Sequence, residues 1–259
     1  MKVLAEGVKF GYSAESKVLD RATWVVNSGV TGLIGENGAG KTTLLSIIAT
    51  LKRPQRGRLL IGGHDAARPS GRRAARRLIG FVPQSYTLAG ELTVTDTVAY
   101  AAWVSGVGRT TCGAAAERAM RLVGLPGRER RRVRALRADE RRLVGIAAAL
   151  AHDPEILVMD APADGLDEAQ RARLRVIVTR LARDRTIILS SCAAADIADM
   201  CDEAAVLAGG RIVYRGSPAA AGALVENGVL SQGSRVGIFE PRVGNGGLRR
   251  DTRQPQGGP

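Results

Sequence analysis

The stretch GENGAGKT, residues Gly35 to Thr42, stands between an apolar run and a segment with helical character. Val30 to Ile34 is expected to form a strand, and Lys41 to Ala49 is expected to form a helix. The stretch matches G-x-x-x-x-G-K-[ST], in which glycines let backbone N–H groups curl around phosphates at the positive end of a helix. The sequence therefore predicts a phosphate-binding loop, and the alternative interpretation is a glycine-rich surface turn.

Predicted strands and helices alternate along the rest of the chain. Short strands are expected at Val3 to Tyr12, Val18 to Val26, Arg58 to Ile61, Ile79 to Val82, Ile156 to Asp160, Thr186 to Ser190, Ala204 to Leu207 and Arg211 to Tyr214. An exposed basic helix is expected at Ser70 to Arg77, and the apolar stripe of another helix is expected at Leu174, Ile177, Val178 and Leu181. This alternation predicts an α/β fold with a largely parallel sheet.

A helical subdomain is expected from Thr93 to about Ala151, inserted into the sheet, with Tyr100 and Trp103 filling its core. We expect residues 1–228 to form one domain. The Gly-, Arg- and Pro-rich residues 229–259 are expected to be a partly disordered tail.

Composition excludes several classes of protein. The 259 residues include 45% hydrophobic but only 3% aromatic residues, which predicts an aliphatic core and argues against a disordered, collagen-like or disulfide-stapled chain. Cys112, Cys192 and Cys201 lack metal-binding spacing and suit a reducing compartment. Without a long apolar run or a signal-like start, the chain is expected to be cytoplasmic unless a partner holds it at a membrane.

The net charge of +13 leaves nucleic acid or an anionic membrane surface open as partners. The basic runs Arg72 to Arg77 and Arg128 to Arg134 contain almost no aromatic residues, which is typical of solvated faces. We therefore expect no specific nucleic acid partner, and attraction to the anionic inner leaflet is the alternative.

The segment ILVMD ends a predicted buried strand with Asp160. An acid at this end of a strand beside a phosphate-binding loop can hold Mg²⁺ through water. Alone the feature is weak, because many buried strands end in aspartate, but together with the loop it is strong.

With these features the chain resembles the ATPases of ATP-binding cassette (ABC) transporters, a group of P-loop NTPases, from about Val3 to Gly216. Tyr12 in FGY, Gln84 in FVPQ and the turn Gly165-Leu166-Asp167 carry the resemblance further, in the family's order. It implies that Tyr12 stacks on adenine, that Gln84 contacts Mg²⁺ and water and links the site to the membrane partner, and that the turn contacts a second subunit. For Tyr12, an ordinary strand aromatic is the alternative.

The resemblance also implies an antiparallel N-terminal sheet and a Mg-ATP site. Lys41 would contact the β- and γ-phosphates. The implied nucleotide-binding residues are Tyr12, Gly35, Glu36, Asn37, Gly38, Ala39, Gly40, Lys41, Thr42, Thr43, Gln84 and Asp160. The implied Mg²⁺ ligands are Thr42, Gln84 and Asp160. The expected partners are an integral-membrane permease and a second ABC ATPase subunit arranged head to tail, at the inner face of the cell membrane.

The chain departs from the family pattern at two catalytic positions. The family has glutamate directly after the Mg²⁺ aspartate to activate water, but Ala161 follows Asp160 here. The family's switch histidine after Ser190-Ser191 is replaced by Cys192. Loss of a positioned base lowers a rate by about 10²- to 10⁴-fold. Asp164 is a neighbouring carboxylate that could replace the lost base.

The family's LSGGQ-like signature aligns with Leu136-Arg137-Ala138-Asp139-Glu140. Ala138 and Asp139 add side chains where glycines allow close approach to a partner's γ-phosphate, and the acidic residues place negative charge toward it. Asp139 is expected to be the N-cap of the following helix, with Glu140 in its first turn. Arg137 reaching a phosphate is an alternative.

These departures predict a subunit, of exporter type by its resemblance to separately encoded single-domain subunits, that binds Mg-ATP and hydrolyses it slowly or not at all. Two alternatives stay open. One is a soluble pseudo-ATPase with a regulatory or nucleic-acid-binding role, and the other is a fully active ATPase.

Overall fold

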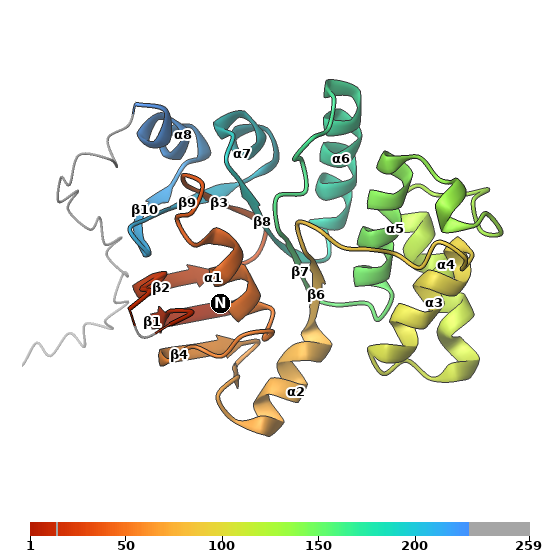
Figure 1. Cartoon of the computed structure of the whole chain (residues 1–259), viewed down its shortest axis with the longest axis horizontal. Coiled ribbons are helices and arrows are strands. Elements are labelled where there is room, and N and C mark those ends of the chain that lie inside the picture. The colour runs from red at the N-terminus through yellow and green to blue at the C-terminus, as the bar shows by residue number, and fades with distance from the viewer. Residues whose placement is uncertain (14, 228–259) are drawn as a thin grey trace, which may run out of the picture.

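The computed structural model describes residues 1–13 and 15–227, which form two sheets with helices around them (Figure 1). The first sheet is antiparallel, as the resemblance implied, and its strands occur in the order β2-β1-β4-β5. Its members are β1 (Val3–Phe10), β2 (Leu19–Val26), β4 (Arg56–Ile61) and β5 (His64–Asp65).

The second sheet has the order β10-β9-β3-β8-β7-β6 and is parallel except for β10, which pairs antiparallel with β9. Its members are β3 (Val30–Ile34), β6 (Ile79–Val82), β7 (Ile156–Met159), β8 (Thr186–Ser191), β9 (Glu203–Ala208) and β10 (Arg211–Gly216). β3, β7 and β8 are buried along their whole length, which agrees with the uninterrupted apolar runs Ile156–Met159 in β7 and Ile187–Leu189 in β8. Because they are parallel, their carboxyl ends meet at one edge of the sheet, where ligands of such folds bind.

The helix after the glycine-rich stretch, α1 (Lys41–Ile48), packs between the two sheets. Its Leu44 and Ile47 lie in one buried cluster with Trp24 of the first sheet and Ile188 of the second. Figure 1 shows α1 beside β1 and β2 and next to the larger sheet. The first turn of α1 is therefore held at the carboxyl edge of β3 by apolar contacts on both sides.

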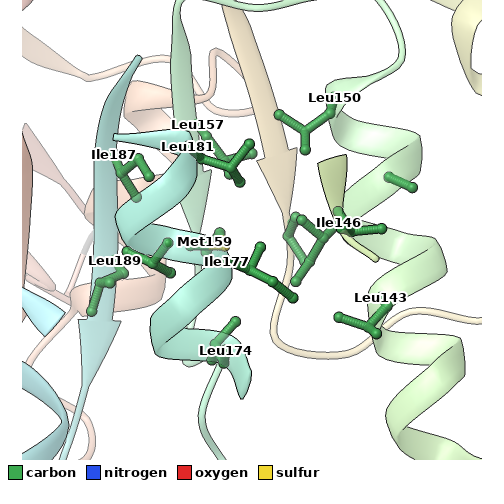
Figure 2. Packing of buried hydrophobic residues seen from close by; sticks show 14 of the residues in the cluster. Leu143, Ile146, Leu150, Leu157, Met159, Leu174, Ile177, Leu181, Ile187 and Leu189 are labelled. Carbon is green, nitrogen blue, oxygen red and sulfur yellow. The ribbon is translucent and has the colours of Figure 1, made fainter. Parts of the chain in front are cut away.

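The opposite face of the larger sheet is covered by α6 (Glu168–Leu181), α7 (Ala194–Met200) and α8 (Pro218–Glu226). The predicted stripe on α6 is confirmed, since its buried residues are Leu174, Ile177, Val178 and Leu181. Figure 2 shows this stripe between the strand residues of β7 and β8 and the leucines and isoleucine of a neighbouring helix, α5 (Ala138–Leu150). The sequence analysis missed α7 and α8, as well as the two-residue strand β5.

The inserted helical subdomain is confirmed, and it consists of α3 (Val94–Val104), α4 (Cys112–Leu122) and α5 with two short 3₁₀ turns between them. In Figure 1 it lies at the side of the larger sheet, away from the antiparallel sheet. The placement predicted for two of its aromatic residues is wrong, because Tyr100 is 59% exposed and Trp103 is 52% exposed. The buried face of α3 carries Val94, Val98 and Ala102, spaced one helical turn apart, and this spacing turns the aromatic residues to the opposite side.

The basic helix is confirmed as α2 (Pro69–Leu78), but two of its arginines bind main-chain groups rather than solvent alone. Arg72 donates two hydrogen bonds to Ala66 O, at 3.1 and 2.9 Å. Arg76 donates to Thr50 O at 3.2 Å and also to the Thr50 Oγ1 hydroxyl at 2.9 Å. Part of this basic run therefore fastens α2 to the fold. The predicted tail 229–259 lies outside the described residues.

Candidate functional site

The loop between β3 and α1 depends on glycines for close backbone approach. Gly40, directly before α1, has φ 103°, and a Cβ there would lie 3.1 Å from Val18 O. A Cβ on Gly35 would lie 2.3 Å from Leu207 O, closer than atoms can approach. Larger side chains at these positions would push the loop away from β2 and β9, so the predicted loop geometry has a steric cause.

Lys41 is buried beneath this loop. Its Nζ donates hydrogen bonds to Gly35 O at 2.7 Å and Glu36 O at 3.0 Å. Both acceptors are neutral carbonyls, so these bonds hold the ammonium group without neutralising its charge. A phosphate group is an anion that could take over these contacts.

Asp160 lies just past the end of β7 and is only 3% exposed. Its Oδ1 accepts a hydrogen bond from Ser190 Oγ at 2.6 Å, and Ser190 Oγ accepts one from the Ala161 N–H at 2.9 Å. Its Oδ2 is buried and has no hydrogen-bond partner within residues 1–13 and 15–227. A buried acceptor without a partner is costly, and a cation or its bound water would satisfy it.

A cavity of about 340 Å³ joins these groups at the carboxyl edge of the sheet. It is lined by Tyr12, Val18, Asn37, Gly38, Gly40, Lys41, Thr42, Thr43, Gln84, Asp160, Ala161, Ser190 and Cys192. The structure thus brings together all three predicted Mg²⁺ ligands and most of the predicted nucleotide-binding residues. Their oxygen donors are the type Mg²⁺ prefers, and the residues fit Mg-ATP.

Three predicted residues lie elsewhere. Gly35 is buried at the base of the loop, whereas Glu36 and Ala39 line a neighbouring cavity of about 350 Å³. That cavity lies on the side of the loop that faces Gly209 and Gly210, in the turn between β9 and β10.

Tyr12 stands at the rim of the cavity that holds Lys41 and Asp160, and it is 62% exposed. Its hydroxyl lies 3.2 Å from Thr43 Oγ1, and Lys52 Nζ lies 4.7 Å from the centre of its ring. Phe10 contacts the ring edge-on, with centroids 5.2 Å apart. This exposed, supported ring can stack on a flat aromatic ligand.

Gln84 follows β6 and donates a hydrogen bond from Nε2 to Asp164 Oδ2 at 3.1 Å. Two residues later, the Tyr86 hydroxyl donates to Arg142 O of α5 at 3.2 Å. Burial raises the pKa of Tyr86. Gln84 is therefore tied to Asp164, the carboxylate that the sequence analysis offers as an alternative base, and Tyr86 is tied to α5, which begins within the segment aligned with the signature.

Ala161 and Cys192, which the resemblance places at the family's catalytic positions, both face the cavity. Ala161 has a left-handed backbone, φ 48°, and brings only a methyl group. Cys192 is exposed, and its Sγ donates to Asn37 Oδ1 at 2.9 Å. A methyl group cannot accept a proton from water, and a thiol is a weaker hydrogen-bond donor than an imidazole N–H.

The signature segment lies outside the cavity lining. The predicted N-cap is wrong, because the helix begins at Ala138 with Arg137 as its N-cap. The Arg137 N–H donates to Glu140 Oε2 at 3.0 Å, and Arg128 donates to Glu140 Oε1 at 2.7 Å. These two bonds, the Arg128 bond foremost, lower the pKa of Glu140. Asp139 instead lies 3.4 Å from the Arg137 guanidinium. The prediction placed the cap at Asp139, two residues too late. An acidic residue near a helix start can act either as the cap or in the first turn, and sequence alone does not separate the two.

Sequence reasoning missed Ser190 and Val18 as cavity residues. Ser190 was noted only as a neighbour of Cys192, and its contact with Asp160 follows from the pairing of β7 with β8. Strand order is the information that was lacking. Among the described residues there is no cluster of three or more His, Cys, Asp or Glu side chains that could hold a metal ion.

Comparison with known proteins agrees with this geometry. The protein-family model described as "ABC transporter" matches residues 19–164. The sulfate/thiosulfate import ATP-binding protein CysA of Mycobacterium tuberculosis (strain ATCC 25618 / H37Rv) is 37% identical over 203 residues, covering 77% of this chain and 57% of that protein. The chain belongs to the ABC transporter family.

Two further relatives from this family are informative. The methionine import ATP-binding protein MetN 1 of Burkholderia ambifaria is 37% identical over 191 residues, covering 72% of this chain and 56% of that protein. The structure of a bacterial Atm1-family ABC exporter with ATP bound has a TM-score of 0.73 at 27% identity, covering 89% of this chain and 40% of that chain. The present chain spans little more than half the length of the curated relatives.

The family binds ATP, which agrees with the cofactor that the phosphate-binding loop predicts. Every helix within residues 1–13 and 15–227 is too short or too polar to cross a lipid bilayer.

Proposed function

We propose that this chain is the ATP-binding subunit of an ABC transporter, and that it binds Mg-ATP in the cavity between the phosphate-binding loop and Asp160. The observation that carries the proposal is the unpartnered, buried Asp160 Oδ2 on the same cavity as Lys41. Bound Mg²⁺ would shield the phosphate charges. The chain's own residues cradle the phosphates, hold the cation beside Asp160 and support the base against Tyr12.

We also propose that hydrolysis by this chain is weak or absent. Ala161 offers no base, and Cys192 offers a poor donor where the family has histidine. Asp164, three residues after Ala161, is the alternative base, but its Oδ2 accepts the Gln84 hydrogen bond, and it does not line the cavity. The expected rate falls about 10²- to 10⁴-fold below that of an intact site.

The proposed partner is a separate membrane permease at the inner face of the membrane, together with a second ATPase subunit. Tyr100, Trp103 and Val104 form an exposed apolar stripe on α3, with the two aromatic rings 5.9 Å apart. Large exposed apolar side chains on one helix face are typical of a contact with another protein. Replacing Trp103 by Glu should abolish co-purification with the co-expressed permease partner while leaving Mg-ATP binding unchanged.

The names of the curated relatives bear on the direction of transport. CysA and MetN 1 carry import in their names but name different substrates at equal identity. Those names favour import for this chain, and the exporter assignment made from the sequence stays a prediction.

Two measurements on the purified chain test the proposal. Saturating Mg-ATP should raise the melting temperature of wild type. In Asp160→Asn the shift should be smaller, and equal to the shift that wild type shows with ATP and a Mg²⁺ chelator. Phosphate release should equal that of Lys41→Ala, which serves as the blank for contaminating ATPases. No thermal shift would overturn nucleotide binding. Release clearly above the blank would overturn weak hydrolysis and favour the fully active ATPase. Strong salt-dependent binding to DNA or RNA without a permease would favour the pseudo-ATPase alternative.

A further inference from the structure

The three cysteines of the chain differ sharply in accessibility. Cys112 is buried, and its Sγ lies 3.3 Å from Gly108 O. Burial, with the nearby carboxylates of Asp202 and Asp196, raises the pKa of the Cys201 thiol to about 12. Cys192 is exposed. Because the thiolate is the reactive form and must be reached by a reagent, Cys192 is the thiol that can react in the folded protein.

Cys192 lies where a bound ligand would lie. It directly follows β8, and its Sγ hydrogen bond to Asn37 Oδ1 joins it to the phosphate-binding loop. Cys192, Asn37 and Lys41 line the same cavity. The buried Asp160 carboxylate, with its unpartnered Oδ2, lines this cavity too and independently points to a ligand there.

We propose that Cys192 is a reversible thiol-modification site, and that a small-molecule disulfide attached to it blocks nucleotide from the phosphate-binding loop. This inference rests on the proposed function, because it concerns regulation of the same cavity. The Cys192 thiol loses its proton to solvent, and its sulfur attacks one sulfur of the disulfide. The disulfide S–S bond breaks, the second sulfur leaves as a thiolate, and a mixed disulfide forms on Cys192. A free thiol reverses the step by the same exchange.

Volume and charge give the block its physical cause. The cavity holds about 340 Å³, and a tripeptide-sized or aromatic adduct on one of its lining residues occupies space that the phosphates need. An adduct with a carboxylate also places negative charge near Lys41, where it competes with phosphate for the ammonium group. The relation is reciprocal, because bound nucleotide covers Cys192 and slows its modification.

The test follows thiol reactivity in the full chain with dithiobisnitrobenzoate, an aromatic disulfide that releases one coloured thiolate for each thiol that reacts. One thiol should react fast, and this phase should vanish in Cys192→Ser but persist in Cys201→Ser. Mg-ATP at 100 times its dissociation constant leaves about 1% of the chain free, so the fast phase should slow about 100-fold. A fast phase that persists in Cys192→Ser, or whose rate Mg-ATP leaves unchanged, would overturn the inference.

A second arm uses wild type alone and measures the Mg-ATP-induced thermal shift before thiolation, after it and after reduction with dithiothreitol. The shift should be lost after thiolation, with the apparent affinity weakened at least about tenfold, and should return on reduction. The smaller methylthio adduct should weaken binding less. A full shift in the thiolated chain overturns the inference and leaves the proposed function intact. No shift in the unmodified chain overturns the proposed function, and the inference with it.

Discussion

The phosphate-binding loop and the signature segment both lead into a helix, α1 and α5, but their polar groups have different partners. At α1 the Lys41 ammonium group donates its hydrogen bonds to two neutral carbonyls, and one oxygen of Asp160 across the cavity has no partner among the residues that the structure describes. At α5 the Glu140 carboxylate caps the helix and pairs with Arg128, and Asp139 lies beside Arg137.

The difference separates a region whose polar groups are left for a ligand from a region whose polar groups are paired within the chain. Buried polar groups without partners are costly unless a ligand completes them, whereas groups paired within the chain stabilise the fold and have less to offer a ligand. We therefore expect changes near α1 to alter nucleotide binding, and changes at the start of α5 to alter the free energy of unfolding instead.

The largest expected effect comes from Lys41→Ala. Mg-ATP at 100 times its dissociation constant should stabilise wild type by about 2.7 kcal/mol, and the variant should lose this stabilisation because the loop then lacks its cation. Thermal unfolding with and without Mg-ATP measures it. Lys2→Ala is the matched control, since Lys2 pairs with Glu155 on the surface at 2.7 Å and should keep the full shift. Equal shifts in all three proteins would remove the distinction between the two regions.

The next effect tests how the loop after Gln84 is held against α5. A Cβ on Gly145 would lie 2.0 Å from the Tyr86 hydroxyl oxygen, so Gly145→Ala should destabilise the fold by about 1–3 kcal/mol. Helix propensity alone predicts the opposite sign, a gain of about 1 kcal/mol. Denaturant unfolding measures the change.

Gly113→Ala in α4 is the control, because no described residue outside its own helix turn lies within 4 Å of the added Cβ, and it should not destabilise the chain. In the double variant Tyr86→Ala/Gly145→Ala the penalty of the second change should shrink, since the clashing ring is gone. If the two changes simply added, the loop and α5 would not be coupled through this contact.

A smaller effect is expected at the start of α5. Glu140→Ala removes the acceptor of the Arg137 N–H and should cost about 1 kcal/mol of unfolding free energy. Glu140→Gln keeps an acceptor and should cost less. Neither variant should change Mg-ATP binding by the isolated chain, as measured by titration calorimetry. Weaker binding in Glu140→Gln would place this segment in the nucleotide site after all.

The smallest effect is a pH dependence. The hydrogen bond from Arg128 lowers the pKa of Glu140 below 4.5, the ordinary value of a glutamate, so the stabilisation is present above that pH and is lost as the pH falls through the folded-state pKa. Arg128→Ala should therefore lower the melting temperature slightly at pH 7, and this difference from wild type should shrink in acid. A difference that stays constant down to pH 3 would show that Arg128 acts through packing rather than through the charge of Glu140.

Local sequence patterns determined much of this protein. GENGAGKT between an apolar run and a helix was sufficient to predict β3, the loop and α1, because each depends on residues next to it in the chain. The same holds for the stripe on α6 and for Asp160 at the end of β7. It was also the sequence, through its likeness to a family, that brought Tyr12, Gln84 and Asp160 into one predicted site.

Only the tertiary structure decided what depends on strand order and on helix rotation. Ser190 reaches Asp160 because β8 lies next to β7, and Cys192 reaches Asn37 because β8 also lies next to β3. Periodicity predicted α3 but not which face it buries, so Tyr100 and Trp103 were misplaced. A hydrophobic pattern reports that a residue prefers burial. Which neighbours then meet it is set by long-range packing, in which a stripe of small aliphatic residues on α3 fitted the core and the two aromatic rings were left outside.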